Sequence, residues 1–177
     1  MSQLNREQLN ELFVLAHEGK SEELQKKLAD FDEDFDKDGF ACILSGAAQF
    51  GHVSCLEMLL PYSDVAHDES LSLQLAAEEG HAQCVERLIP LSDPNTRACH
   101  PLRYALAYGH LDCAKVLYPH TDIKTALAVM QNEYPSEADK WRKVFEDIKQ
   151  ELEADAQYQV LQSAVDQCQT PQAIRRV

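Results

Sequence analysis

Apolar positions along the chain follow the period of an α-helix, and the whole pattern then repeats every 29 residues. The pairs Gly51-His52, Gly80-His81 and Gly109-His110 mark this interval. Six other sets keep the same register: Leu44, Leu73 and Leu102; Ala47, Ala76 and Ala105; Cys55, Cys84 and Cys113; Leu59, Leu88 and Leu117; Pro61, Pro90 and Pro119; Asp64, Asp93 and Asp122. The sequence therefore predicts a protein built from structural repeats of 29 residues.

Each repeat predicts two short helices joined by a tight turn. Leu73, Ala76 and Ala77 have helical spacing, and Gly80 supplies a residue that readily ends a helix in the left-handed conformation. A second helical pattern follows and stops before Pro90, with apolar positions at Cys84, Val85, Leu88 and Ile89. One helix pair cannot cover its own apolar faces, so neighbouring units must stack on each other.

The chain outside the three clear units predicts helical caps. Leu12, Leu15, Ala16, Gly19, Leu24 and Leu28 form a degenerate first unit, with a 32-residue step from Gly19 to Gly51. After Asp122, an apolar segment over 126–130 leads to a charged amphipathic helix over about 137–154, and another helix is possible over 157–166. We expect a single domain: capping repeat and acidic linker 1–40, repeats 41–122, and helical cap and tail 123–177.

The segments LSLQLAAEEGHAQCVERLI and PLRYALAYGHLDCAKVL resemble ankyrin repeats. The resemblance covers 41–122 well and extends weakly to 11–40, and it implies an all-α ankyrin-repeat solenoid of stacked helix-turn-helix units. Ankyrin units usually have 33 residues, so the projecting finger between units should be truncated here. Only Pro101-Leu102 keeps the Pro-Leu pair of the family, and the preceding Thr is missing, so its hydrogen bonds must be replaced or absent.

The resemblance implies that a ligand binds on the concave side, where the two residues before each Gly-His pair are exposed. Phe50 and Tyr108 are the strongest candidates, because aromatic side chains are enriched among interface anchors. They could instead pack over neighbouring turns. The full set of predicted binding residues adds an acidic centre and two turn residues: Gln49, Phe50, Tyr62, Glu78, Glu79, Tyr108 and His120.

Charge narrows the class of partner. The chain has 30 acidic and 16 basic residues and a formal net charge of -14, which repels nucleic-acid phosphates and anionic lipid. We therefore expect a protein partner with a basic surface. The chain shows no signal sequence or membrane span, which predicts that it stays in the cytoplasm with reduced cysteines, or leaves it by an unusual route. We also expect a monomer.

An acidic run over 30–39 has the beginning of a calcium loop but lacks its end. With Asp34 at position one, position twelve is Ser45 instead of the bidentate Glu that calcium loops require. A solvated acidic linker is the simpler interpretation. The alternative is a docking patch for basic residues of a partner, formed by Asp32, Glu33, Asp34 and Asp36.

The motif H-x-x-C occurs three times, at His52/Cys55, His81/Cys84 and His110/Cys113, and suggests zinc. Stacked units place equivalent residues about 8–10 Å apart, too far to share one ion. We therefore interpret each His as capping its turn and each Cys as a small buried apolar residue.

No phosphate loop, nucleophile motif or carboxylate pair occurs in a recognisable context. The sequence therefore predicts a non-catalytic interaction module without cofactor or metal. The alternative function is a small acidic inhibitor or immunity protein that neutralises a basic enzyme or toxin.

Overall fold

The computed structural model describes residues 6–29 and 37–169, and these residues form helices and turns without a strand. One layer contains α1 (Arg6–His17), α3 (Lys37–Gln49), α5 (His67–Glu78), α7 (Thr96–Tyr108) and α9 (Ile123–Glu133). The other contains α2 (Ser21–Leu28), α4 (Val53–Leu59), α6 (Ala82–Leu88) and α8 (Leu111–Leu117), and the chain then continues into α10 (Ala138–Gln169).

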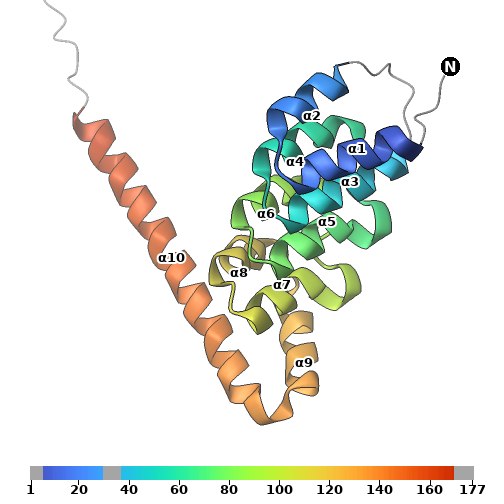
Figure 1. The fold of residues 1–177 in the computed structure, drawn as a ribbon. Helices are drawn as coiled ribbons and strands as arrows, with labels where there is room; N and C mark the ends of the chain where they lie inside the picture. Colours follow the sequence, from blue (N-terminus) through green and yellow to red (C-terminus); the bar gives the residue numbers. More distant parts are fainter. Residues whose placement is uncertain (1–5, 30–36, 170–177) are drawn as a thin grey trace, which may run out of the picture.

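Each helix packs against its equivalent in the next unit. In the first layer, α1 contacts α3, α3 contacts α5, α5 contacts α7 and α7 contacts α9; in the second, α2, α4, α6 and α8 follow in the same way. Figure 1 shows the resulting row of helix pairs. The predicted all-α solenoid is thus confirmed, and α1 and α2 form a further helix pair at its N-terminal end.

The core runs continuously through the row because the repeated apolar positions are buried in every unit. Leu73, Ala76 and Ala77 of α5 have no exposed surface, and neither do Cys84 and Leu88 of α6. Full burial of a leucine side chain stabilises a fold by roughly 1.5–3 kcal/mol. We call the layer of α1, α3, α5, α7 and α9 the inner layer and the layer of α2, α4, α6 and α8 the outer layer. Alanines on the inner layer let neighbouring helices approach, while leucines on the outer layer fill the space between them.

The turn inside each unit has the same geometry at Gly51, Gly80 and Gly109. All three glycines are left-handed, with φ of +71°, +84° and +82°, a conformation that is costly for residues with a Cβ. The amide of the following His then donates to a carbonyl in the preceding helix, over 2.9, 2.8 and 2.7 Å in the three units. The repeated sequence therefore produces a repeated helix end.

The links between units are short. Helices α4, α6 and α8 each end in a 3-10 turn, which contains Pro61, Pro90 or Pro119, and a few residues then lead directly into the next inner helix. No hairpin finger projects from the described links. Other side chains hold them: the Ser70 hydroxyl accepts a hydrogen bond from the Asp93 amide over 3.1 Å, and Asn95 Oδ1 accepts one from the Asp122 amide over 2.7 Å.

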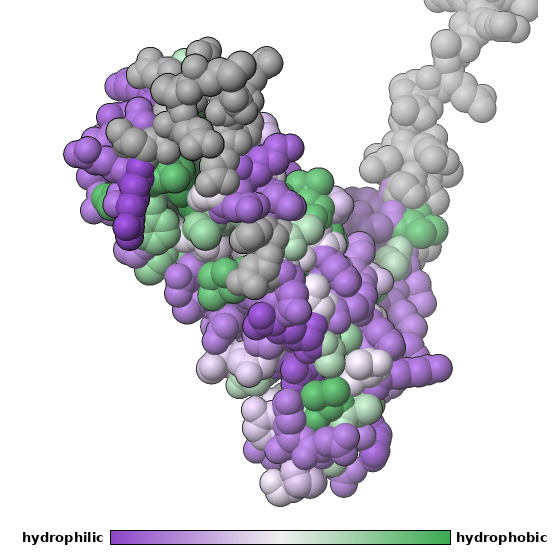
Figure 2. Space-filling model, turned by 90° about the vertical axis from the view of Figure 1, so that its right-hand side faces the viewer, coloured by the Kyte–Doolittle hydropathy of each residue, from purple (hydrophilic) through white to green (hydrophobic). Residues whose placement is uncertain are grey.

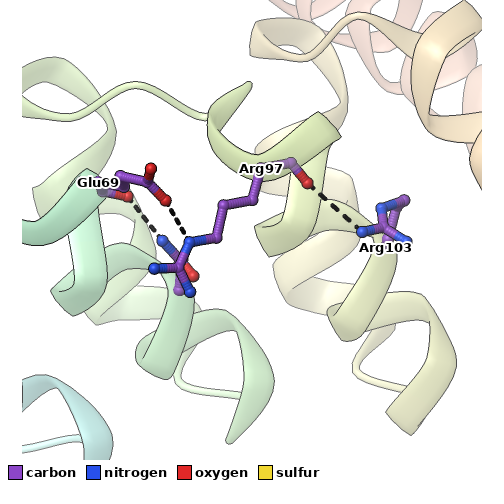
Figure 3. A network of polar contacts seen from close by, with 4 residues as sticks. Glu69, Arg97 and Arg103 are labelled. Carbon is purple, nitrogen blue, oxygen red and sulfur yellow. Dashed lines mark hydrogen bonds and ion pairs between the residues drawn. The ribbon is translucent and has the colours of Figure 1, made fainter.

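Helix α7 begins with a left-handed turn at Arg97, Ala98 and Cys99, and its regular part starts near Pro101. The buried Arg103 stabilises this turn by donating to the Ala98 carbonyl over 2.8 Å and to the Arg97 carbonyl over 3.4 Å. Figure 3 shows this contact beside the ion pair that joins Arg97 to Glu69 at the start of α5. These contacts fix the start of one inner helix relative to its neighbour.

The C-terminal cap differs from the sequence-based prediction. The two helices expected over 137–154 and 157–166 are one continuous helix, α10, of 32 residues. Its first half packs on the end of the stack through Trp141, Phe145 and Ile148, whereas Tyr158 is 62% exposed. Figure 1 shows the second half projecting away from the row of helix pairs. No helix breaker lies between the two expected helices, so the backbone continues without a break.

Candidate partner-binding face

The residues directly before each Gly-His pair lie at the ends of consecutive inner helices. Phe50 is 43% exposed and Tyr108 is 57% exposed, although both are large apolar side chains. Glu79 is exposed as well, while Gln49 and Glu78 are half-buried. The structure therefore repeats the same two positions along one edge of the inner layer, with aromatic residues on either side of an acidic unit.

Phe50 belongs to an aromatic cluster at the N-terminal end of the stack. Its ring lies 4.0 Å from that of His17 and 6.4 Å from that of His52, measured between centroids. Phe13 extends the cluster, 5.9 Å from His17, and rests against Gly46 of α3, where a Cβ would come within 3.2 Å of its ring. Phe50 thus packs along one side and stays accessible on the other.

Tyr108 belongs to a second aromatic cluster near the C-terminal end. Its ring lies 5.9 Å from that of Tyr104 and 6.4 Å from that of His110, and Tyr104 stacks on His100 at 3.8 Å. The neighbouring Glu78 carboxylate raises the pKa of Tyr108, because a second negative charge close to it is unfavourable. The phenol therefore stays protonated and makes a side-chain hydrogen bond with Glu78.

Two predicted residues lie elsewhere. Tyr62 stacks on Phe40, with 5.5 Å between ring centroids, near the start of α3, whereas Phe50 follows the end of that helix. Ten residues of helix separate the two positions by about 15 Å. His120 is exposed in the equivalent turn after α8, and its carbonyl accepts a hydrogen bond from Asn95. Neither is brought together with the residues before the Gly-His pairs.

The acidic patch Asp32, Glu33, Asp34 and Asp36 lies outside the described residues.

Figure 2 shows one face of the molecule as mostly hydrophilic, with hydrophobic residues in small separate patches.

The cysteines of the H-x-x-C motifs are buried. Cys55, Cys84 and Cys113 are free thiols in the core, and burial raises the pKa of Cys84 and of Cys113 to about 11. Protonated thiols are poor metal ligands. Within the described part of the chain, no three His, Cys, Asp or Glu side chains gather closely enough to hold a metal ion.

The sequence predicts that the histidines of these motifs cap their own turns, and this prediction is wrong. Their side chains reach back to the preceding unit instead. His52 Nε2 lies 3.0 Å from the His17 carbonyl, and His81 Nε2 lies 2.9 Å from the Gln49 carbonyl. The outer helices receive no side-chain cap from them. The stacking of units brings a carbonyl of the previous inner helix within reach, so each ring connects two units.

Sequence reasoning missed Phe13, His17 and Tyr104 as members of the aromatic clusters. His17 stands two residues before Gly19, as Gln49 stands before Gly51, so the register alone could have placed it. Phe13 and Tyr104 required knowledge of which side of the inner helix stays open.

A family model described as ankyrin repeats, in three copies, matches residues 44–126. Residues 44–126 are ankyrin repeats. The resemblance read from the sequence is thereby confirmed for the central units, and ankyrin repeats are in general protein–protein interaction modules and typically non-catalytic. No curated protein shows significant similarity to the chain. Among the helices of the described residues, none is both long and apolar enough to cross a membrane.

Proposed function

We propose that the chain is a non-catalytic interaction module whose ankyrin stack holds a protein partner on its concave face. The observation that carries the proposal is the exposure of Phe50 and Tyr108 at equivalent positions of different repeats. Folding alone gives no reason to leave two large rings accessible there, since each could have been replaced by a polar residue. Aromatic side chains are enriched among the residues that contribute most to protein interfaces.

The partner we propose has a basic surface. Glu78 and Glu79 lie between the two aromatic anchors along the stack, and the whole chain has a formal net charge of -14. Opposite charges at an interface speed encounter and disfavour acidic competitors such as nucleic acid. We further propose that the module acts as a monomer in the cytoplasm and needs neither cofactor nor metal.

A pull-down from native lysate tests the proposal. The unmodified chain should capture a discrete set of proteins, and Phe50→Ala combined with Tyr108→Ala should lose them. Leu91→Ala combined with Tyr158→Ala is the matched control, because it also removes two exposed apolar side chains, but outside the proposed face. Equal capture by all three preparations would contradict the site assignment.

The acidity of the chain also favours a second candidate, an inhibitor or immunity protein that neutralises one basic enzyme or toxin. An inhibitor should bind its target in a one-to-one complex and abolish the activity of that target, whereas an adaptor should leave it intact. Titration calorimetry combined with an activity assay of the captured protein separates the two functions.

A further inference from the structure

The glycines that end the inner helices, Gly19, Gly51, Gly80 and Gly109, form a ladder along the stack, and a histidine of the next unit covers the first three. A Cβ built on any of three of them would lie within 2.5–2.6 Å of an imidazole Nδ1, for Gly19 with His52, Gly51 with His81 and Gly80 with His110. In the first two pairs, Nε2 lies within hydrogen-bond distance of the carbonyl two residues before the glycine, at His17 and Gln49. A carbonyl only accepts, so Nε2 carries the proton in both pairs.

The last position of this ladder is empty among the described residues. A Cβ built on Gly109 would have no neighbour within 4 Å, although the backbone of Gly109 has the same left-handed conformation as Gly80. The reason is that α9 ends at Glu133, whereas the register of the repeat would place the counterpart of Gly109 at residue 138. The last turn of α7 is therefore uncovered, and Ala107, Tyr108 and Gly109 are all exposed.

We propose that an arginine side chain of the protein partner occupies this position and lies flat on Gly109 as the imidazoles lie on the other glycines. The inference rests on the proposed function and specifies which chemical group of the basic partner is recognised. The carbonyl of Ala107 takes the place that the carbonyls of His17 and Gln49 have in the earlier units.

The surroundings select a guanidinium over other donors. A planar group fits the position, because the occupants of the equivalent positions are planar imidazole rings against glycine. The Glu78 carboxylate interacts with Tyr108 at the edge of the position and favours a cation. Guanidinium is planar, remains charged at neutral pH and stacks on aromatic rings, whereas the ammonium of lysine is compact and strongly hydrated. Imidazole is mostly neutral at pH 7, with a pKa of about 6.5.

Titration of the ¹⁵N-labelled full chain with N-acetyl-arginine methylamide, followed by NMR, tests the inference. The amide signal of Gly109 should shift and saturate, while those of Gly51 and Gly80 should not move. The lysine analogue at the same concentrations should produce no saturable shift. A response at Gly109 that is linear, or equal for both analogues, would overturn the proposal.

Two variants locate the site. Gly109→Asn keeps a residue that tolerates the left-handed conformation and fills the open space, so binding should weaken at least tenfold in a protein whose other signals are unchanged. Tyr108→Leu leaves Gly109 untouched but removes the aromatic ring, and should weaken binding severalfold. Unchanged affinity in both folded variants would also contradict the inference.

Phe50→Ala separates this inference from the proposed function. It should reduce capture of the protein partner but leave the affinity for the arginine analogue unchanged, because Phe50 belongs to the other aromatic cluster. If capture depends on Phe50 and Tyr108 while the arginine analogue fails to bind, the arginine site is wrong and the interaction module stands. If the analogue binds but neither side chain affects capture, the binding face is wrong.

Discussion

Gly80 and Gly109 share a backbone conformation but differ in what lies above them, so one substitution made at both positions isolates the stacking of the histidine. Alanine at either position must adopt a positive φ, at a cost of roughly 1–2 kcal/mol. At Gly80 its Cβ would also come within 2.5 Å of His110 Nδ1, whereas at Gly109 it meets no described atom within 4 Å. Gly80→Ala should therefore lower the free energy of unfolding more than Gly109→Ala, by about 1 kcal/mol or more. Urea denaturation of both variants measures the difference, and equal values would mean that the imidazole does not pack there.

The cysteines differ in reactivity for a reason that is also local. Burial raises the pKa of Cys84 and Cys113 to about 11, so only about one thiol in a thousand is ionised at pH 8. Cys42 is exposed. In a Cys168→Ser background, a thiol reagent at pH 8 should label one cysteine rapidly and the four buried ones only after denaturant is added. Rapid labelling of Cys84 in the folded protein would show that the core opens readily.

At the level of single residues, the sequence predicted burial better than it predicted contacts. Cys55, Cys84 and Cys113 were expected to be buried because they recur on the apolar side of a helical pattern, and they are buried. The predicted role of His52, capping its own turn, is wrong. Its hydrogen-bond acceptor is His17, 35 residues earlier, and only the distance between stacked units decides that pairing.

At the level of the helix, α10 divides into a half that covers the end of the stack and a half that projects from it. Phe145→Ala should destabilise the protein by about 3–5 kcal/mol, because Phe145 is 3% exposed and its removal leaves a cavity against the last unit. Tyr158→Ala should change stability by less than about 0.5 kcal/mol, as is usual at exposed positions. Thermal or urea unfolding measures both effects, and similar losses would mean that the distal half is also packed.

The helix boundaries show which signals are local and which are not. The ends of α3, α5 and α7 were predictable because a left-handed glycine follows each helix, and α4, α6 and α8 stop just before a proline for an equally local reason. The continuity of α10 was missed because the apolar pattern of its first half ends near Leu152 while good helix formers continue beyond it. Apolar periodicity reports packing, and an unpacked helix does not display it.

At the level of the whole molecule, the repeat determined the fold, but the sequence alone left the shape of the proposed binding face open. Equivalent residues of different units had to lie on one side, so Phe50, Glu79 and Tyr108 could be placed together from their register. The uncovered turn at Gly109 was not predictable, because it depends on where α9 ends relative to α7. The early end of α9 also exposes the part of α7 to which we assign the arginine of a partner.

Site-specific photo-crosslinking shows whether one partner contacts both Phe50 and Tyr108. Benzoylphenylalanine is introduced at position 50, at position 108, or at position 86 on the outer helix α6, where Glu86 is exposed. Irradiation in native extract should give one adduct of the same mass from positions 50 and 108 and none from position 86. An adduct from position 86 alone, or different adducts from positions 50 and 108, would contradict a single partner-binding face on the inner layer.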